Sequence, residues 1–247
     1  MHTWTSFETP LTPLRRLRVL VTGFRDFDAD QDGVVDTNPT KRLAQVVANR
    51  IGSVTAATSE GEAVVATVEG HVLDVTWSRA GAEDVAPPGA ADVLEELVKA
   101  RRPDLVVTTG ATARRSGAFS VSSMATDFDV GRIAYGEPQG RSQYTVGKGA
   151  PEFELATALP IEAIHRAWQA QNVAFVPEAT AGNYICNDIF YRLLWMRSRT
   201  THGRAVLRGG FVHMAIDVTE DAAILAIRAL IGACLSTLSR VEIEGTR

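Results

Sequence analysis

Cys186 and His213 are the residues whose types and positions best suit covalent chemistry. Cys186 follows a predicted strand at 173–180 and a short Ala-Gly-Asn turn, and it begins the amphipathic segment CNDIFYRLLW. A thiol at a helix amino terminus lies beside unpaired N–H groups and the positive end of the helix dipole, which stabilise a thiolate. The same N–H groups can receive an oxyanion. Cys186 is therefore a candidate nucleophile; a small buried residue at a helix start is the alternative.

A thiolate nucleophile requires a histidine as its base, and His213 is the candidate among the five histidines. It ends a predicted strand at 205–215, one strand–helix unit after Cys186, so the two side chains can meet at one sheet edge. The other histidines lie at the amino terminus, within a strand, on an amphipathic helix and in a polar loop (His2, His71, His165 and His202). A structural hydrogen bond is the alternative role for His213.

Composition narrows the class of protein. The 247 residues carry a net charge of −4, which argues against a nucleic-acid binder or a protein that binds anionic membranes. Two cysteines are too few for a disulfide framework or a multi-cysteine zinc site, and Cys234 lies in an apolar helix pattern that predicts a buried, inert thiol. We find no signal peptide and no apolar run long enough to cross a bilayer, so we expect a cytoplasmic enzyme without a cofactor.

Motifs for nucleotides, serine nucleophiles and metals find little support. The sequence lacks the glycine pattern of a dinucleotide turn, the Lys-Ser/Thr of a phosphate loop and a G-x-S-x-G elbow. The loop DADQDG (residues 28–33) matches the first half of a calcium loop, but its twelfth position is Pro39 in place of a bidentate glutamate. A solvated acidic loop is the favoured interpretation, no metal site is predicted, and calcium binding there stays open.

Strand and helix patterns alternate along the chain, which predicts a single three-layer α/β/α domain with a mostly parallel central sheet. Residues 1–16 are read as an amino-terminal extension and 17–247 as the domain. Ligands of such sheets bind beyond the carboxyl ends of the strands, where both candidate residues fall. The expected strands are 17–24, 71–77, 104–110, 173–180 and 205–215, with strands or a hairpin in 119–133; the expected helices are 39–50 (capped by Asn38), 91–102, 161–171, one from Cys186, and 220–239.

Four segments resemble the pyroglutamyl peptidase I family of cysteine omega-peptidases. They are TAGNYICNDIFY around Cys186, GGFVH ending at His213, the opening LVTGFRDF with the later Asn-Pro-Thr, and PEFELATALPIEAI at 151–164. The likeness runs from about residue 17 to the last helix. It implies a cysteine hydrolase built as one α/β domain, with Cys186 as nucleophile and His213 as general base and acid, without cofactor, and a homodimer or homotetramer.

The sequence departs from this family where the family carries its third catalytic residue. The position of the family's glutamate is Ser122, the arginine after it is Ser123, and the family's glutamine is Ala111, whereas Arg115 is retained. A carboxylate at a strand end, Asp127 first and Asp129 second, is the predicted replacement that orients His213.

The resemblance also implies an aromatic pocket for a flat lactam ring. Phe24, Phe27 and Tyr184 match positions that line it, and Arg115 and Ser122 complete the predicted substrate-binding set. The sequence thus predicts a cysteine-dependent hydrolase that cleaves an amide, a lactam-type small molecule or the amino-terminal pyroglutamyl group of a peptide. The alternative is a weakened or inactive family member that binds a small molecule.

Overall fold

The computed structural model describes residues 15–26, 37–76, 88–114, 116–126, 154–182, 184–199 and 208–239. Within them lies an eight-stranded mixed sheet in the order β2-β3-β1-β4-β8-β5-β6, with β7 paired to β5. Strands β3, β1, β4 and β8 run parallel, and β8 pairs antiparallel to β5. The strands are β1 (Arg15–Phe24), β2 (Ser53–Ala57), β3 (Ala63–Leu73), β4 (Leu105–Thr112), β5 (Phe119–Thr126), β6 (Glu154–Ala156), β7 (Glu178–Thr180) and β8 (Arg208–Ala215).

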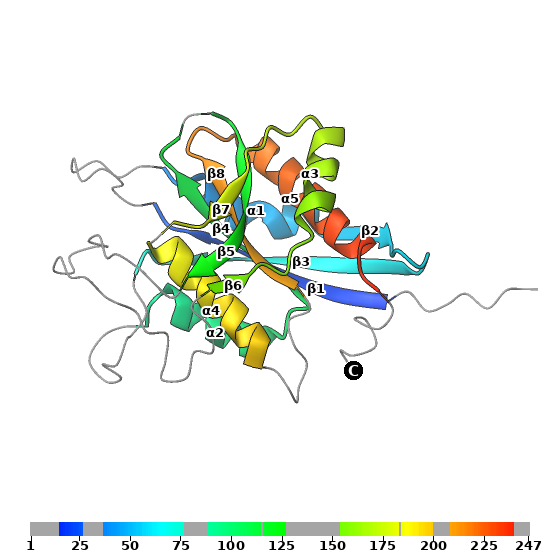
Figure 1. Ribbon diagram of the computed structural model, residues 1–247, viewed down its shortest axis with the longest axis horizontal. Coiled ribbons are helices and arrows are strands. Elements are labelled where there is room, and N and C mark those ends of the chain that lie inside the picture. Colours follow the sequence, from blue (N-terminus) through cyan, green and yellow to red (C-terminus); the bar gives the residue numbers. More distant parts are fainter. Residues whose placement is uncertain are drawn as a thin grey trace, which may run out of the picture.

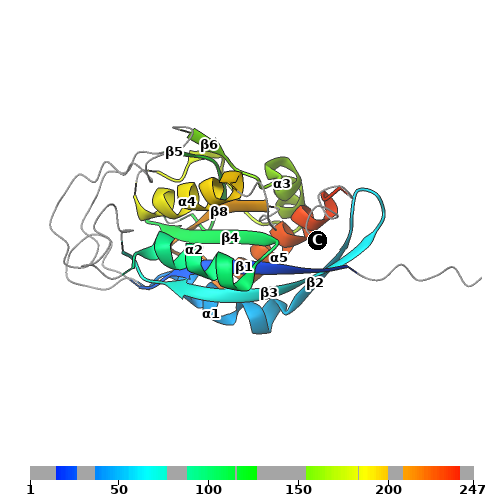
Figure 2. The ribbon, with the colours of Figure 1, turned by 90° about the horizontal axis from the view of Figure 1, so that it is seen from below.

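Helices cover both faces of this sheet, which confirms the predicted three-layer α/β architecture (Figures 1 and 2). Helices α1 (Pro39–Ile51), α3 (Ile161–Ala170) and α5 (Glu220–Ser236) pack on one face. Helices α2 (Ala90–Arg101) and α4 (Ile185–Arg199) pack on the other. Each face has its own buried apolar cluster, and no helix in the described part of the chain is long and apolar enough to cross a membrane.

The connection from β1 to α1 is held by a buried polar cap, as the sequence predicts. Asn38 caps α1 by accepting a hydrogen bond from the Thr40 N–H at 3.0 Å. The Thr40 hydroxyl in turn accepts from the Phe24 N–H at 2.9 Å and donates to the Asn38 side chain at 2.8 Å. Gly23 permits this approach, because a Cβ there would lie 2.0 Å from the Thr40 carbonyl oxygen. The carboxyl end of β1 is thereby fixed to the first turn of α1.

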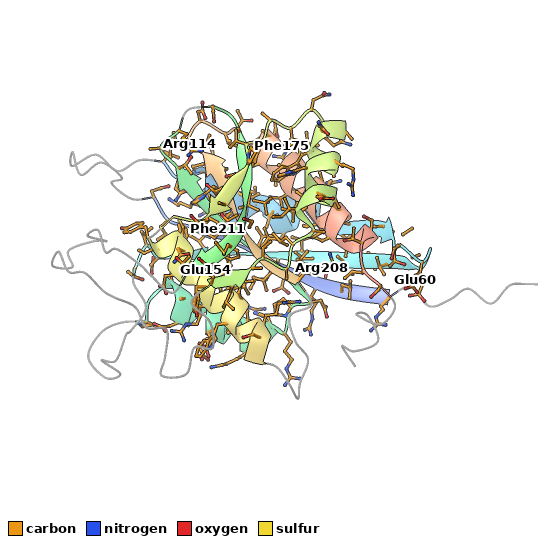
Figure 3. All side chains as sticks on the ribbon, viewed as in Figure 1. Glu60, Arg114, Glu154, Phe175, Arg208 and Phe211 are labelled. Carbon is orange, nitrogen blue, oxygen red and sulfur yellow. The ribbon has the colours of Figure 1, made fainter. Side chains whose placement is uncertain are left out.

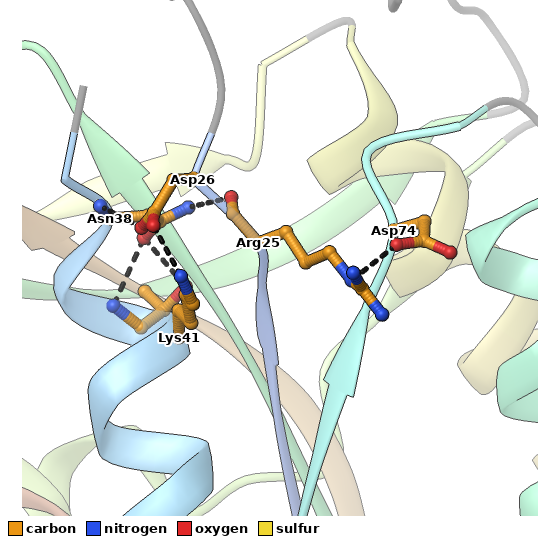
Figure 4. A network of polar contacts seen from close by, with 6 residues as sticks. Arg25, Asp26, Asn38, Lys41 and Asp74 are labelled. Atoms are coloured by element: carbon orange, nitrogen blue, oxygen red, sulfur yellow. Dashed lines mark hydrogen bonds and ion pairs between the residues drawn. The ribbon is translucent and has the colours of Figure 1, made fainter. Parts of the chain in front are cut away.

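A second layer of polar contacts surrounds this cap (Figure 4). Asp26 accepts from the Asn38 N–H at 2.9 Å and pairs with Lys41, while the Asn38 side chain donates to the Arg25 carbonyl at 3.2 Å. Arg25 reaches across to Asp74, just past the end of β3. Burial by itself raises the pKa of Asp26, but the contacts with Lys41 and Asn38 hold that pKa below its ordinary value. The ends of β1 and β3 are therefore tied together at the sheet edge where ligands are expected.

Two predicted strands differ from the structure. The strand expected at 71–77 is the end of a longer strand, β3, which stops at Leu73 and forms a hairpin with β2 that the sequence analysis missed. The strand expected at 173–180 reduces to Glu178–Thr180, with an isolated bridge from Phe175 to Phe119. Pro177 has no N–H to donate, which explains why continuous pairing begins only after it. Residues 127–133 of the predicted segment 119–133 lie outside the described residues.

The Thr40 hydroxyl provides a test of the β1–α1 connection. Thr40→Val keeps the shape of the side chain but leaves the buried Phe24 N–H without its acceptor, so we expect the free energy of unfolding to fall by about 1–3 kcal/mol. Urea denaturation measures it. Thr67→Val on β3 is the matched control, since Thr67 is exposed and its hydroxyl makes only a 3.3 Å contact with the Leu17 carbonyl. Equal losses in the two variants would contradict this role for Thr40.

Candidate active site

Cys186 is the second residue of α4, close to the predicted helix start. The N–H groups of Asn187 and Asp188 donate to the Tyr184 carbonyl at 2.7 and 3.2 Å and so form the first turn. The Asn187 side chain then clamps this turn to the end of β5. It accepts from the Thr126 N–H at 3.0 Å and donates to the Thr126 carbonyl at 2.7 Å. The residue after the cysteine therefore fixes the position of the thiol over the sheet.

The sulfur of Cys186 lies against β4 at Gly110. A Cβ at residue 110 would approach the Sγ atom to 2.9 Å and the ring of Phe211 to 2.7 Å, so only glycine leaves space for both groups. Gly110 on β4 is the register partner of His213 on β8. Phe211 lies two residues before His213, so both side chains are on the same face of β8, in the middle of the molecule (Figure 3). The sheet register thus brings the thiol and the imidazole to one place.

His213 is buried between the thiol and a carboxylate. Its ring packs edge-on against Phe211 with a centroid distance of 4.7 Å, and its Nδ1 lies 2.9 Å from the Glu178 Oε2. Burial by itself lowers the pKa of His213, but hydrogen bonds and charge interactions with Cys186 and Glu178 raise that pKa to about 9. The imidazole is therefore protonated at neutral pH, and with Nδ1 on Glu178 the remaining nitrogen, Nε2, is left for the sulfur.

Glu178 is a site residue that the sequence analysis missed. It lies on β7, and its partner in the parallel register with β5 is Ser122, whose hydroxyl donates to the Glu178 Oε2 at 2.6 Å. Burial raises the pKa of Glu178, but His213, Ser122 and Ser120 together hold that pKa below its ordinary value. The sequence does show a carboxylate shortly before Cys186, directly after a proline. It does not show that this carboxylate lies beside Ser122, because the two residues are far apart in sequence.

The other predicted site residues have different outcomes. Phe24 is buried in an apolar cluster, and Tyr184 and Cys186 pack against the same cluster. Ser122 is fully buried and contacts Glu178, and Ser123 donates to the Ala179 carbonyl at 2.8 Å. Predicted residues that lie outside the described part of the chain are Phe27, Arg115, Asp127, Asp129 and the acidic loop 28–33.

The second thiol, Cys234, has no such surroundings. It is buried in α5 within the apolar cluster on the opposite face of the sheet, as the sequence analysis predicts. Burial raises the pKa of the Cys234 thiol to about 12. Among the two cysteines, only Cys186 therefore combines partial exposure with a histidine partner.

A family model described as pyroglutamyl peptidase matches residues 17–227. The chain belongs to the pyroglutamyl peptidase family. It is thus a cysteine peptidase, and several curated relatives named pyrrolidone-carboxylate peptidase resemble it. That of Cupriavidus necator is 30% identical over 63% of this chain and 76% of its own length. That of Clavibacter michiganensis subsp. michiganensis is 27% identical over 91% of this chain and 96% of its own.

Solved structures of the family share the fold. Pyroglutamyl peptidase I of Bacillus amyloliquefaciens superposes with a TM-score of 0.65 at 21% identity, covering 90% of this chain and 100% of that one. Pyrrolidone carboxyl peptidase of Thermococcus litoralis gives a TM-score of 0.65 at 20% identity, covering 89% of this chain and 93% of that one. The α/β architecture is therefore that of the family.

Gly110 offers a test of the contact between the sulfur and β4. In Gly110→Ala the new methyl group must displace Sγ or the Phe211 ring, so we expect kcat to fall about 100-fold, because a misplacement of about 1 Å at a reacting group has that effect. Steady-state hydrolysis of a pyroglutamyl amide measures it. Gly232→Ala on α5 is the matched control, since a Cβ there meets nothing within 4 Å. An unchanged kcat in Gly110→Ala would show that the sulfur does not need this space.

The raised pKa of His213 predicts how stability depends on pH. The folded protein binds this proton more tightly than the unfolded chain, whose histidine pKa is near 6.5. Protonation of His213 therefore adds its full contribution to the free energy of unfolding below pH 6.5, and this contribution is lost as the pH rises through about 9. Urea unfolding of the native chain and of His213→Gln across this range measures the contribution as a difference, which should shrink with rising pH. A constant difference would contradict a shifted histidine.

Proposed function

We propose that this protein hydrolyses the amide bond after an amino-terminal pyroglutamyl residue, with Cys186 as nucleophile and His213 as general base and acid. The observation that carries the proposal is the position of the Cys186 thiol, which lies at the start of α4 against Gly110, the register partner of the buried His213. Family membership supports the reaction class, and the curated relatives carry the name of this activity. A buried imidazolium beside a thiol favours the thiolate, the form that attacks carbonyl carbon.

The reaction follows from the two groups. The Cys186 Sγ forms a bond to the amide carbonyl carbon, and the carbonyl oxygen takes up the electron pair. When the intermediate collapses, the carbon–nitrogen bond breaks and His213 gives its Nε2 proton to the departing amine. His213, now neutral, takes a proton from water as the hydroxide attacks the thioester. Release of pyroglutamate restores the thiolate and the protonated imidazole.

The first turn of α4 supplies the environment for the oxyanion. The N–H groups of Asn187 and Asp188 already donate to the Tyr184 carbonyl. We therefore assign the oxyanion to the amino-terminal end of α4, at the N–H of Cys186. The positive end of the helix dipole acts at the same place. Donors fixed in this way need no reorganisation during the reaction.

The apolar cluster beside the thiol suits the flat faces of a lactam ring. Tyr184 and Cys186 pack against the buried cluster that contains Phe24, and the Phe211 ring borders the space at Gly110 that the sulfur occupies. An apolar site with a few aimed polar groups is typical of small-ligand recognition. Ala111 and Ser123 stand where the family carries glutamine and arginine, and we therefore expect a higher KM for pyroglutamyl substrates than for family members that retain both.

Cys186→Ala tests the nucleophile. We expect hydrolysis of a pyroglutamyl fluorogenic amide to fall at least about 1,000-fold, because loss of the nucleophile removes the covalent route. Cys234→Ala is the matched control, since that thiol is buried on the other face of the sheet, and its kcat should match the native chain. Retention of turnover in Cys186→Ala would refute the proposal.

Alkylation with iodoacetamide provides a readout without substrate. At neutral pH Cys186 should react at least about 100-fold faster than Cys234, because the thiolate is the reactive form. Mass spectrometry of the two cysteine peptides measures both rates in one sample. In His213→Ala the Cys186 rate should drop to that of an ordinary thiol. Equal rates for Cys186 in the native chain and in this variant would rule out a thiolate–imidazolium pair.

A further inference from the structure

The side chain behind His213 is a carboxylate on a different strand from the one that the family resemblance indicates. The family position for the glutamate is Ser122 on β5, which is fully buried and carries a hydroxyl. The carboxylate in contact with His213 is Glu178 on β7, the direct register partner of Ser122. Side chains of register partners lie next to each other on one face of a sheet.

We propose that Glu178 is the positioning residue of His213, and that the orienting carboxylate has moved from β5 to β7, where Ser122 holds it in place. This inference rests on the proposed function, because positioning His213 matters only if the imidazole serves Cys186. Glu178 itself touches neither the thiol nor the substrate in this scheme, and it acts through the histidine.

The geometry explains how one carboxylate oxygen of Glu178 can position the His213 ring. The Glu178 Oε2 accepts two hydrogen bonds, from the His213 Nδ1–H at 2.9 Å and from the Ser122 hydroxyl at 2.6 Å. Nδ1 is thereby kept protonated and fixed in direction, so Nε2 points to the remaining partner, the sulfur. The serine hydroxyl fixes the carboxylate in the same way that the carboxylate fixes the ring.

The charges around the pair are consistent with an ionised carboxylate. Within the described residues, the titratable groups that act on His213 are Cys186 from α4 and Glu178 from β7. Glu178 interacts with one titratable group, His213 from β8, and with two hydrogen-bonding hydroxyls, those of Ser120 and Ser122 from β5. The His213 and Glu178 side chains are only 10% and 14% exposed, so solvent screens their interaction weakly. Three donors around one buried carboxylate keep it negative, and this charge raises the pKa of the imidazole.

Glu178→Gln separates positioning from simple structural support. The amide keeps the size of the side chain but removes its charge and its preference for a single Nδ1–H tautomer. We expect kcat to fall about 100-fold or more with KM within about 3-fold of the native value. The alkaline limit of kcat/KM should also move from near pH 9 towards 6.5, the pKa of an unassisted histidine. Glu162→Gln on α3 is the control, because the Glu162 side chain is 93% exposed.

The rate of Cys186 alkylation gives the same information without any substrate. In Glu178→Gln the Cys186 rate at neutral pH should fall at least about 10-fold, because a less basic imidazole holds its proton beside the sulfur less often. If the native chain fails to hydrolyse pyroglutamyl amides while this fall is present, the proposed substrate is wrong and the positioning role stands. If neither the alkylation rate nor kcat changes in folded Glu178→Gln, the positioning role is overturned. A fall seen in Asp127→Asn in place of Glu178→Gln would also overturn it.

Returning the carboxylate to β5 provides the decisive variant. In Ser122→Glu/Glu178→Ser, the hydroxyl and the carboxylate exchange register positions, so we expect kcat within about 10-fold of the native chain, while Glu178→Ser by itself stays about 100-fold below it. Circular dichroism confirms that both variants fold. A double variant as inactive as Glu178→Ser, although folded, would show that β5 and β7 are not interchangeable and would overturn the transfer of the carboxylate.

Discussion

The positive charge on the buried His213 is the constraint around which the site is arranged. A buried imidazolium is costly unless a partner of opposite charge is held close by, and that partner is costly in its turn unless its own oxygens are satisfied. Glu178 neutralises the ring, and hydroxyls from β5 satisfy Glu178. The pKa of the histidine is therefore set jointly by three strands and one helix, since the sulfur on α4 is the remaining partner. A change in any of these elements alters the protonation state on which the thiol depends.

Backbone geometry decides whether these groups meet. The parallel register of β4 and β8 sets Gly110 beside His213, and the missing side chain of Gly110 leaves the volume that the sulfur occupies. The reciprocal hydrogen bonds between Asn187 and Thr126 then prevent the start of α4 from sliding along the sheet. A helix held at both its sulfur and its neighbouring amide has little freedom left. The position of the thiol is thus determined by packing on one side and hydrogen bonding on the other, which is the rigid support that covalent catalysis requires.

Local patterns were sufficient to predict the elements that carry the thiol and the imidazole. The mostly apolar segment that ends near His213 predicts a strand, and the amphipathic segment after the Ala-Gly-Asn turn predicts a helix that begins near Cys186, because both signals are contained in a few neighbouring residues. The pairing of Ser122 with Glu178 could not be predicted in this way. It depends on two short strands that are far apart in sequence and on a proline that limits one of them to three residues. The sequence predicts Asp127, a residue outside the described part of the chain, and it cannot indicate Glu178, because strand register is absent from the local pattern.

A carboxylate can change strands without a change of fold, because the pKa and the orientation of the histidine depend on where the negative charge lies. They do not depend on which strand carries the carboxylate. Neighbouring strands lie about 4.8 Å apart, and side chains of register partners share a face, so a longer side chain on the outer strand can reach the point that a side chain on the inner strand would fill. Glu178 has that length, and the short Ser122 leaves the space and adds a donor. Loss of a family glutamate from its sequence position is therefore poor evidence for loss of activity. The relevant quantity is the negative charge near Nδ1 of the histidine, and here β7 supplies it.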